Sequence, residues 1–239
     1  MKQIKELESF RKEIKGDLLF DYDLKKRNWF NIGGKAEIYF KPETLNELVL
    51  FVKKFSSEYR IFTLGAGSNI LLSDDKILGA VIKLGKNFSN ISLLSNEKII
   101  VGSACTDKQV SDFAMENNIG GLEFLSCIPG TIGGGLRMNS GCFGTEFKDI
   151  LLSVQALDKK GNMVTIPSNK INFGYRYSGL DRNLIFLSAS LKGKHKAKNE
   201  IKEEIIFLRD KKSKSQPTQI KTGGSTFKNP INQTKEKVW

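Results

Sequence analysis

Apolar residues recur at helical spacing in four stretches of this 239-residue chain, and each stretch predicts a helix. The predicted helices cover residues 3–15, 44–55, 106–120 and 199–212. In the first helix, one apolar stripe indicates a single buried face: Ile4, Leu7, Phe10 and Ile14.

Two of the predicted helices begin with a threonine that is followed three residues later by Glu or Gln. Thr44 with Glu47, and Thr106 with Gln109, each predict a capping box, in which the two residues satisfy free amides at the start of the helix. The Gly-Gly pair at 120–121 is placed to end the third helix.

Short runs of apolar and β-branched residues between the helices predict strands. A Gly-Gly turn at 33–34 leads into one strand, and a KKGN turn joins two others as a hairpin. The two strands of the hairpin are 150–158 and 163–167, and the remaining predicted strands are 60–64, 70–73, 80–84, 98–102 and 184–191. Helices, parallel-type units and hairpins are intermixed, which indicates an α+β fold. A shift in composition at 192–200 marks the start of a smaller unit.

Composition favours a soluble globular protein, since 39% of the residues are hydrophobic and 27% are charged. No apolar run approaches the ~20 residues that span a bilayer, so we expect no membrane partner. The first residues, MKQIKELESFRKEIKG, form a charged amphipathic helix and do not resemble a signal peptide. A cytoplasmic location is therefore expected.

The formal net charge of +12 favours anionic partners such as phosphorylated small molecules or nucleic acid. A lysine-rich, solvated surface explains the same number equally well. The lysine runs at 192–198 and 210–215 contain no interleaved aromatic residues. Stacking on single-stranded nucleic acid is therefore poorly supported, and we expect no nucleic-acid partner.

The three cysteines, Cys105, Cys127 and Cys142, form no CxxC pair. Their number and spacing argue against a zinc site and against a disulfide framework, so we expect reduced, partly buried thiols and no metal. The one histidine, His195, lies in a lysine run, where it is expected to be solvated.

The motif LGAGSN at 64–69 is the first candidate binding element. Its glycines allow backbone amides to point into one concavity that suits a pyrophosphate. It lacks the third glycine of a dinucleotide fingerprint and the Gly-Lys-Ser/Thr of a phosphate-binding loop. The alternative is an ordinary tight turn between strands. The candidate residues are Gly65, Ala66, Gly67, Ser68 and Asn69.

Residues 121–147 contain seven glycines, far above an average share of about 7%. Pro129 and Gly130 fix a turn, and 133–135 is a Gly-Gly-Gly run whose backbone carries no side chains. Apolar residues are interspersed and require burial, which excludes a flexible linker. The segment is expected to be an ordered, glycine-lined wall of a ligand site.

Two shorter motifs contain candidate catalytic side chains. In FGYRYSG, Arg176 lies between two tyrosines, either as a surface cation–π arrangement or as a guanidinium positioned for a carboxylate or a developing enolate. In GGSTFKNP, Ser225 has no histidine partner. A serine can donate a proton only to a strongly basic site such as a carbanion, so acid catalysis to carbon fits better than acyl transfer.

Taken together, LGAGSN, IPGTIGGGLRMNSGCFGTE, FGYRYS and GGSTFKNP occur in the order and at the spacing of the UDP-N-acetylenolpyruvoylglucosamine reductases, which this chain closely resembles from about Arg27 to Pro230. The resemblance implies an α+β, FAD-binding fold of the vanillyl-alcohol-oxidase (PCMH) type. It divides the chain into FAD-binding subdomains at 1–92 and 93–195 and the start of a substrate-binding domain at 196–239.

The resemblance also implies the reaction. NADPH reduces FAD, and hydride from flavin N5 then reaches the enolpyruvyl carbon of UDP-N-acetylglucosamine enolpyruvate, in peptidoglycan precursor synthesis. Ser225 protonates the enolate, Arg176 stabilises it, and Asn229 joins them in the substrate site. Residues 65–69 hold the flavin pyrophosphate. The other cofactor contacts come from Ser126, Ile128, Pro129, Gly130, Thr131, Gly133, Gly134 and Asn139.

The chain departs from the family pattern at its end, because members continue past FKNP into a segment that carries a third catalytic residue, a glutamate. We therefore expect a truncated chain in which FAD binding survives better than turnover. Lys211, Lys212 or Lys214 is expected to contact ligand, with no basis for choosing among them. A monomer is expected. The alternatives are another flavin oxidase or dehydrogenase of the same fold, and a basic scaffold or nucleic-acid-binding protein.

Overall fold

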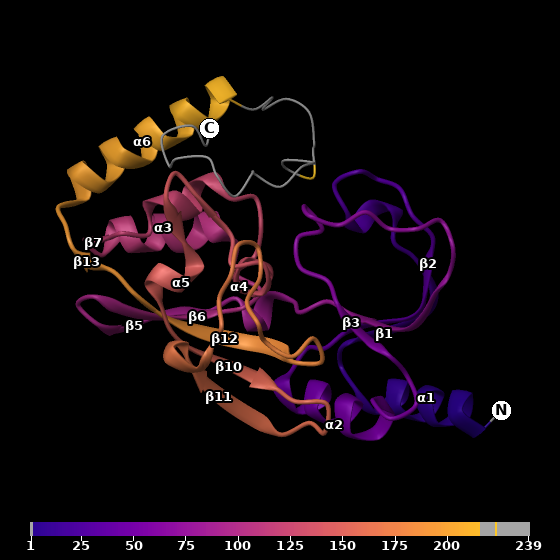
Figure 1. The fold of residues 1–239 in the computed structure, drawn as a ribbon. Helices are drawn as coiled ribbons and strands as arrows, with labels where there is room; N and C mark the ends of the chain where they lie inside the picture. The colour runs from indigo at the N-terminus through magenta and orange to yellow at the C-terminus, as the bar shows by residue number, and fades with distance from the viewer. Residues whose placement is uncertain (1, 216–222, 224–239) are drawn as a thin grey trace.

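The computed structural model describes residues 2–215 and Gly223, and two sheets of unlike arrangement organise them (Figure 1). The N-terminal sheet has the order β1-β2-β4-β3. β1 pairs with β2 in antiparallel fashion, whereas the β2/β4 and β3/β4 pairs are parallel. Its strands are β1 (Asp17–Asp23), β2 (Lys35–Lys41), β3 (Ile61–Thr63) and β4 (Ile77–Ile82).

The second sheet is antiparallel throughout and has the order β11-β10-β12-β6-β5. Its strands are β5 (Ile91–Ser95), β6 (Lys98–Gly102), β10 (Leu151–Leu157), β11 (Met163–Pro167) and β12 (Ile185–Lys192). Two small ribbons join β7 (Ile119–Gly120) to β13 (Lys194–His195) and β8 (Gly141–Cys142) to β9 (Thr145–Glu146).

Helices cover both sheets, and α6 crosses the outer side of α3 (Figure 1). The α-helices are α1 (Lys2–Glu13), α2 (Leu45–Phe55), α3 (Asp107–Glu116), α4 (Ile132–Arg137), α5 (Phe147–Ile150) and α6 (Lys198–Ser215). The 3-10 turns are η1 (Lys25–Arg27), η2 (Lys86–Phe88), η3 (Glu123–Cys127) and η4 (Ser168–Lys170). Among the described residues, no helix is long and apolar enough to cross a bilayer.

The hydrophobic core joins the two lobes of the molecule, each of which is built on one of the two sheets. α1 and α2 pack their apolar faces on the N-terminal sheet, and Phe10 and Phe51 are almost fully buried there. The same cluster contains Leu157, Ile185 and Leu187 from the second sheet. Burial of such side chains contributes about 1.5–3 kcal/mol each, so the two sheets stabilise one another. The predicted boundary at residue 92 falls inside β5, and the three-part division stays a prediction.

Most predicted helices and strands are confirmed, including the hairpin of β10 with β11 and the capping box of Thr106 with Gln109. The predicted strand at 70–73 is wrong. Its apolar alternation is real, since Leu71 is exposed while Leu72 packs against the N-terminal lobe, but no neighbouring strand provides a ladder. The loop of 65–69 therefore leads into irregular chain.

Two predicted helix ends also differ. Thr44 caps α2 through the amide of Glu47, but the Glu47 carboxylate accepts from the amides of Lys15, Gly16 and Glu43 at 2.8–3.2 Å. The Glu47 carboxylate therefore joins the segment before β1 to α2, and these bonds form in place of a local capping box. α3 ends at Glu116 because Asn118, with φ +57°, takes the left-handed turn that 120–121 was expected to supply.

Candidate functional site

The glycine loop, residues 65–69, lies between the two lobes. It follows β3 and is anchored at Gly67, whose φ is +72° and whose carbonyl accepts from the amide of Trp29 at 3.0 Å. A Cβ at Gly67 would lie 2.2 Å from the carbonyl oxygen of Arg27. Glycine is therefore required both for the backbone conformation and for the close approach.

Gly65 brings the first predicted motif against the second. A Cβ at this position would lie 2.6 Å from the hydroxyl oxygen of Thr131. Thr131 also forms an antiparallel bridge with Thr106, so it is fixed to the start of α3. The two glycine-rich segments meet here, at residues 66 positions apart in sequence, and leave no space for a side chain between them.

One cation that sequence reasoning missed contacts the glycine loop. Lys83, directly after β4, donates its ammonium to the carbonyl of Gly65. Arg27 approaches Gly67 with its carbonyl, whereas its guanidinium bonds to the Tyr22 hydroxyl and packs over the rings of Tyr22 and Tyr39 at 5.3 and 5.7 Å. Burial first, and then the charges of Arg27 and Lys41, lower the pKa of Lys83. Within the described part of the chain, no ion pair is formed by Lys83, Arg27 or Lys41. Such a cluster favours an anion.

The 126–139 segment is less bare than the sequence suggests. Its Gly-Gly-Gly run forms the body of α4, and two of the three glycines face protein. A Cβ on Gly133 would meet Ser103 at 3.1 Å, and one on Gly135 would meet the ring of Phe147 at 2.3 Å. Gly134 is exposed, and a Cβ there would meet only the Thr131 hydroxyl at 3.6 Å.

Residues 126–131 form the entrance to α4 with their side chains at intermediate depth. Pro129 is exposed, whereas Ser126, Ile128, Gly130 and Thr131 are half-buried. Together with Gly134, they line the side of the segment that turns toward solvent. The loop of Ala66, Ser68 and Asn69 is likewise half-buried to exposed.

Asp107, at the start of α3, is fully buried beneath this segment. A Cβ on Gly130 would lie 2.7 Å from Asp107 Oδ2, and neither carboxylate oxygen has a hydrogen-bond partner among the described residues. Burial raises the pKa of Asp107 to about 8. Asn28 Oδ1, next to Gly67, is also buried and has no hydrogen-bond partner among the described residues.

Asn139 is fully buried, and its amide group is occupied by the protein. Nδ2 donates to Glu146 Oε2 and to the carbonyl of Gly174, both at 3.0 Å, and Oδ1 accepts from the amide of Lys148. It therefore joins the end of α4 to the Arg176 turn. Its predicted contact with cofactor stays a prediction.

Arg176 occupies a four-residue turn closed by two hydrogen bonds between Gly174 and Tyr177. Its φ is +55°, a conformation that costs a non-glycine residue roughly 1–3 kcal/mol and is concentrated at functional sites. Nη2 donates to the carbonyl of Gly141 at 3.2 Å, and the guanidinium lies 4.8 Å from the Tyr175 ring centroid. The cation–π contact is therefore present, and Nη1 also lies 3.9 Å from Glu146 Oε1. A guanidinium positioned for a substrate carboxylate or enolate stays a prediction.

The three lysines of α6 differ in their surroundings. Lys214 is paired with Asp210 at 2.6 Å, and Lys211 lies over the ring of Phe143 at 4.9 Å. Lys212 is half-buried and donates to the carbonyl of Cys127, at the entrance of the 126–139 segment. Of the three, Lys212 is the one in contact with that segment.

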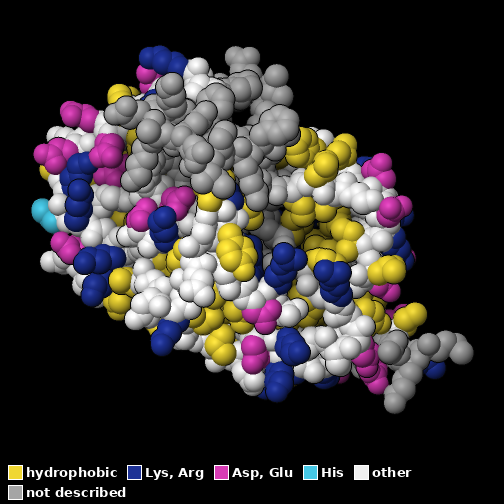
Figure 2. Space-filling model, viewed as in Figure 1, with side chains coloured by type: hydrophobic (Ala, Val, Ile, Leu, Met, Phe, Trp, Pro, Cys, Tyr) yellow, Lys and Arg dark blue, Asp and Glu magenta, His cyan; other side chains and the backbone are white. Residues whose placement is uncertain are grey.

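Ser225 and Asn229 lie outside the described residues. Gly223, two positions before Ser225, is described, and a Cβ there would lie 3.0 Å from the ring of Phe30. Phe30 is 41% exposed and belongs to the loop that packs on Gly67. In Figure 2, apolar side chains gather around a hollow beside the N-terminal lobe, with Lys and Arg side chains along its lower edge.

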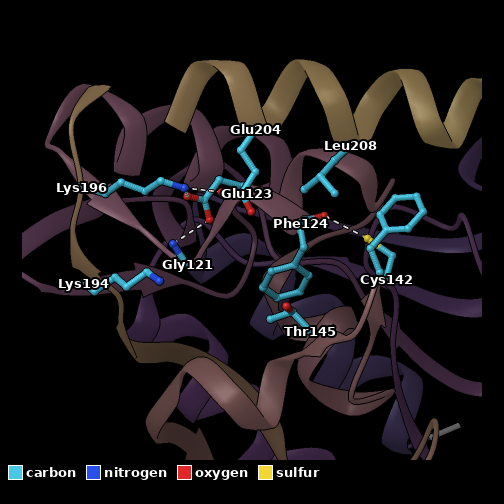
Figure 3. Close-up of a pocket in the computed structure, with 10 residues that line it drawn as sticks. Gly121, Glu123, Phe124, Cys142, Thr145, Lys194, Lys196, Glu204 and Leu208 are labelled. Atoms are coloured by element: carbon cyan, nitrogen blue, oxygen red, sulfur yellow. Dashed lines mark hydrogen bonds and ion pairs between the residues drawn. The ribbon is translucent and has the colours of Figure 1, made fainter. Parts of the chain in front are cut away.

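A separate cavity of about 190 Å³ lies beneath α6 (Figure 3). It is lined by residues from η3, the β8–β9 ribbon, β13 and α6, and Lys196 crosses one end between Glu123 and Glu204. None of the residues predicted from the sequence to bind cofactor or substrate lines it. No group of three or more His, Cys, Asp or Glu among the described residues could hold a metal ion.

Comparisons with known proteins agree with this geometry. A family described as "FAD binding domain" matches residues 36–167, which contain both glycine-rich segments. The p-cresol methylhydroxylase structure shares the fold, with a TM-score of 0.56 at 15% identity over 81% of this chain and 43% of that one. The fold is α+β and of the FAD-binding PCMH type.

Closer relatives share one name. A UDP-N-acetylenolpyruvoylglucosamine reductase from Pelagibacter ubique is 61% identical over 99% of this chain and 78% of its own length, and one from Rickettsia canadensis is 43% identical over 91% and 73%. The crystal structure of the Thermus caldophilus reductase superposes with a TM-score of 0.79 at 29% identity, over 92% of this chain and 77% of that one. The chain belongs to the family of UDP-N-acetylenolpyruvoylglucosamine reductases.

Proposed function

We propose that this chain binds FAD and, with NADPH as the reductant, reduces UDP-N-acetylglucosamine enolpyruvate to UDP-N-acetylmuramate in peptidoglycan precursor synthesis. The observation that carries the proposal is the meeting of Gly65 with Thr131, which brings two glycine-rich segments to one place. The family relationship, at 61% identity to a reductase of that name, supplies the substrate class.

The residues present fit FAD. Its diphosphate needs backbone amides and cations, and the Lys83 ammonium, which has no carboxylate partner among the described residues, lies at the Gly65 carbonyl. We propose that 65–69 hold the diphosphate and that 126–134 contact the ring system. Bound FAD supplies the hydride chemistry, and the protein supplies binding, orientation and charge.

Arg176 is proposed to stabilise negative charge on the substrate. Its guanidinium is held by the Gly141 carbonyl and the Tyr175 ring, so little reorganisation accompanies the reaction. Ser225 is proposed to give its proton to the substrate carbon, and Asn229 to contact substrate. The position of Gly223 on Phe30 supports this, because it brings the chain within two residues of Ser225 to the lobe that carries the glycine loop.

Further proposals concern the setting of the reaction. We place it in the cytoplasm, where NADPH and nucleotide sugars are made, and we propose that the protein works as a monomer. Light scattering of the purified chain tests the second point, and a mass of 26.8 kDa is the expected result.

The proposed function is tested by three readings on one purified sample. A visible flavin absorbance shows cofactor binding, bleaching by NADPH without oxygen shows the first half-reaction, and its recovery with the enolpyruvyl sugar nucleotide shows the second. Recovery with oxygen but not with the sugar nucleotide would instead support a flavin oxidase. A colourless protein that takes up no FAD would overturn the proposal as a whole.

A further inference from the structure

Glu146 lies where three segments that surround Arg176 meet. It ends β9, where its register partner is Gly141, and it directly precedes α5. The carbonyl of the same Gly141 accepts a hydrogen bond from Arg176 Nη2 at 3.2 Å. The proposed function uses Arg176 and gives no role to Glu146.

The two carboxylate oxygens of Glu146 have different partners. Oε2 accepts a hydrogen bond from Asn139 Nδ2 at 3.0 Å and lies 2.9 Å from the ammonium of Lys148. Oε1 lies 3.9 Å from Arg176 Nη1, a separation longer than a hydrogen bond. One oxygen is therefore held by the protein, and charge attraction joins the other to the guanidinium.

Asn139 connects the carboxylate to the backbone of the Arg176 turn. Its Nδ2 also donates to the carbonyl of Gly174 at 3.0 Å, and its Oδ1 accepts from the amide of Lys148 at 3.0 Å. The side chain is fully buried, so water does not compete for these hydrogen bonds. A single amide group therefore fixes the Glu146 carboxylate relative to the turn that carries Arg176.

The Arg176 side chain is 34% exposed, and a half-exposed arginine has many rotamers available to it. A surface ion pair alone restrains such a side chain only weakly. Here the carboxylate is itself fixed by Asn139, and the guanidinium also contacts the Gly141 carbonyl and the Tyr175 ring. These contacts together favour one orientation of the guanidinium.

We propose that Glu146 is a positioning residue, which holds the guanidinium of Arg176 in one orientation for the negatively charged group of the substrate. A guanidinium carries five N–H donors, so its contacts with Gly141 and Glu146 leave other donors for a ligand. Glu146 acts through Arg176 and needs no contact with the substrate. The effect on the substrate rests on the proposed function, whereas the orientation of Arg176 does not.

The orientation is tested first in the chain without cofactor or substrate, by the side-chain N–H resonance of Arg176 in an isotope-labelled sample. Arg176→Lys assigns this resonance by removing it. Because the guanidinium lies over the Tyr175 ring, 4.8 Å from its centroid, the ring should shift the resonance upfield in the parent chain. In Glu146→Gln the resonance should move toward the position of a solvated arginine. The same position in the parent chain and in Glu146→Gln would overturn the proposal.

The choice of variants separates positioning from folding. Glu146→Gln keeps the size of the side chain and the backbone amide that donates to Asp149 Oδ2, so the start of α5 should be retained. Glu146→Asp keeps the charge and a good helix-capping residue but withdraws the carboxylate by one methylene group, and it should also lose the upfield shift. Glu116→Gln, at an exposed carboxylate paired with Lys198, is the matched control. If it changed the resonance as much as Glu146→Gln does, the effect would not be specific and the proposal would fail.

Flavin reoxidation by the enolpyruvyl sugar nucleotide measures the consequence for the reaction. Glu146→Gln should slow this step about 10- to 100-fold, the cost of a misplaced group, and should leave FAD binding and reduction by NADPH unchanged. In an Arg176→Lys background the same change should cost nothing more, because Glu146 acts through Arg176. Losses that multiply in the double variant would show an independent role and overturn the proposal. A parent chain that the sugar nucleotide does not reoxidise would count against the proposed function, and the Arg176 resonance would still decide the role of Glu146.

Discussion

The two glycine-rich segments look alike in sequence but use glycine differently. In the 65–69 loop, the missing side chains let backbone approach backbone, and the nearest groups are the Arg27 carbonyl, Thr131 and the Lys83 ammonium. In the 126–139 segment, Gly133 and Gly135 let α4 pack on Ser103 and Phe147 inside the lobe. We propose that the first segment binds an anion. The second is largely used for packing, and we propose that Gly134 and its entrance loop contact a ligand.

The largest effect is expected from Gly67→Ala. The residue has a φ of +72°, and the Cβ of the alanine would lie 2.2 Å from the Arg27 carbonyl oxygen. Because both effects destabilise the folded state, we expect a loss of about 3 kcal/mol or more of unfolding free energy, measured in urea. Gly144→Ala is the matched control, because its φ is +91° but no atom lies within 4 Å of the new Cβ. Equal losses in the two variants would show that the close approach has no role.

Two adjacent glycines of α4 test whether the 126–139 segment uses glycine mainly for packing. Gly135→Ala meets the buried ring of Phe147 and should destabilise the protein by about 1–3 kcal/mol. Gly134→Ala, one residue earlier and exposed, should leave the unfolding midpoint unchanged and weaken FAD binding. The assignment of Gly134 to the flavin wall is wrong if its alanine variant binds FAD as the parent chain does.

Lys83→Met tests whether the cations at the glycine loop serve a ligand. A charge-assisted hydrogen bond is worth about 1.5–3 kcal/mol, so FAD affinity should fall roughly 10- to 100-fold. Stability should be kept or rise, because burial lowers the pKa of Lys83 and the change removes a partly buried charge. Lys76→Met, at an exposed lysine paired with Asp21, should change neither quantity. A loss of stability with normal FAD affinity would make Lys83 a structural residue.

Asp107→Asn is expected to have an effect that depends on pH. Burial raises the pKa of Asp107 to about 8, so the folded protein keeps a proton that the unfolded chain loses above pH about 4. Stability from this group is complete below that pH and declines as pH rises toward 8. The variant should therefore gain stability relative to the parent, by roughly 1–3 kcal/mol at pH 8 and little at pH 4.

Asp112→Asn, at an exposed carboxylate paired with Lys108, is the control for this pH series. It should show no comparable trend. A parent chain and Asp107→Asn variant with parallel stability curves between pH 4 and pH 8 would show that Asp107 is ionised in the folded state.

Local sequence patterns correctly predicted the elements that depend on residues close together in sequence. The apolar stripe of α6 is buried at Ile201, Ile205 and Leu208, and the Thr106 capping box forms as expected, since spacing alone determines which side chains face the core. The strand at 70–73 failed because strand formation also needs a partner strand, which no local pattern can report. Glu47 failed as a capping residue for the same reason, since its amide partners Lys15 and Gly16 lie some thirty residues away.

The candidate site was predicted from motifs, and its supporting residues were not. Lys83 stands in an ordinary context after a strand, and only the fold brings its ammonium to the glycine loop. Asp107 resembles any acidic residue in the first turn of a helix, where it is usually solvated.

We propose that the glycine loop and the 126–134 stretch form two walls of one FAD site. Hydrogen exchange of the chain with and without FAD measures peptides from each segment separately in one experiment. FAD is expected to slow exchange in both segments together and to leave the residues of the cavity beneath α6 unchanged. Protection of only one segment, or protection centred on the cavity residues, would show that the two segments do not share an FAD site.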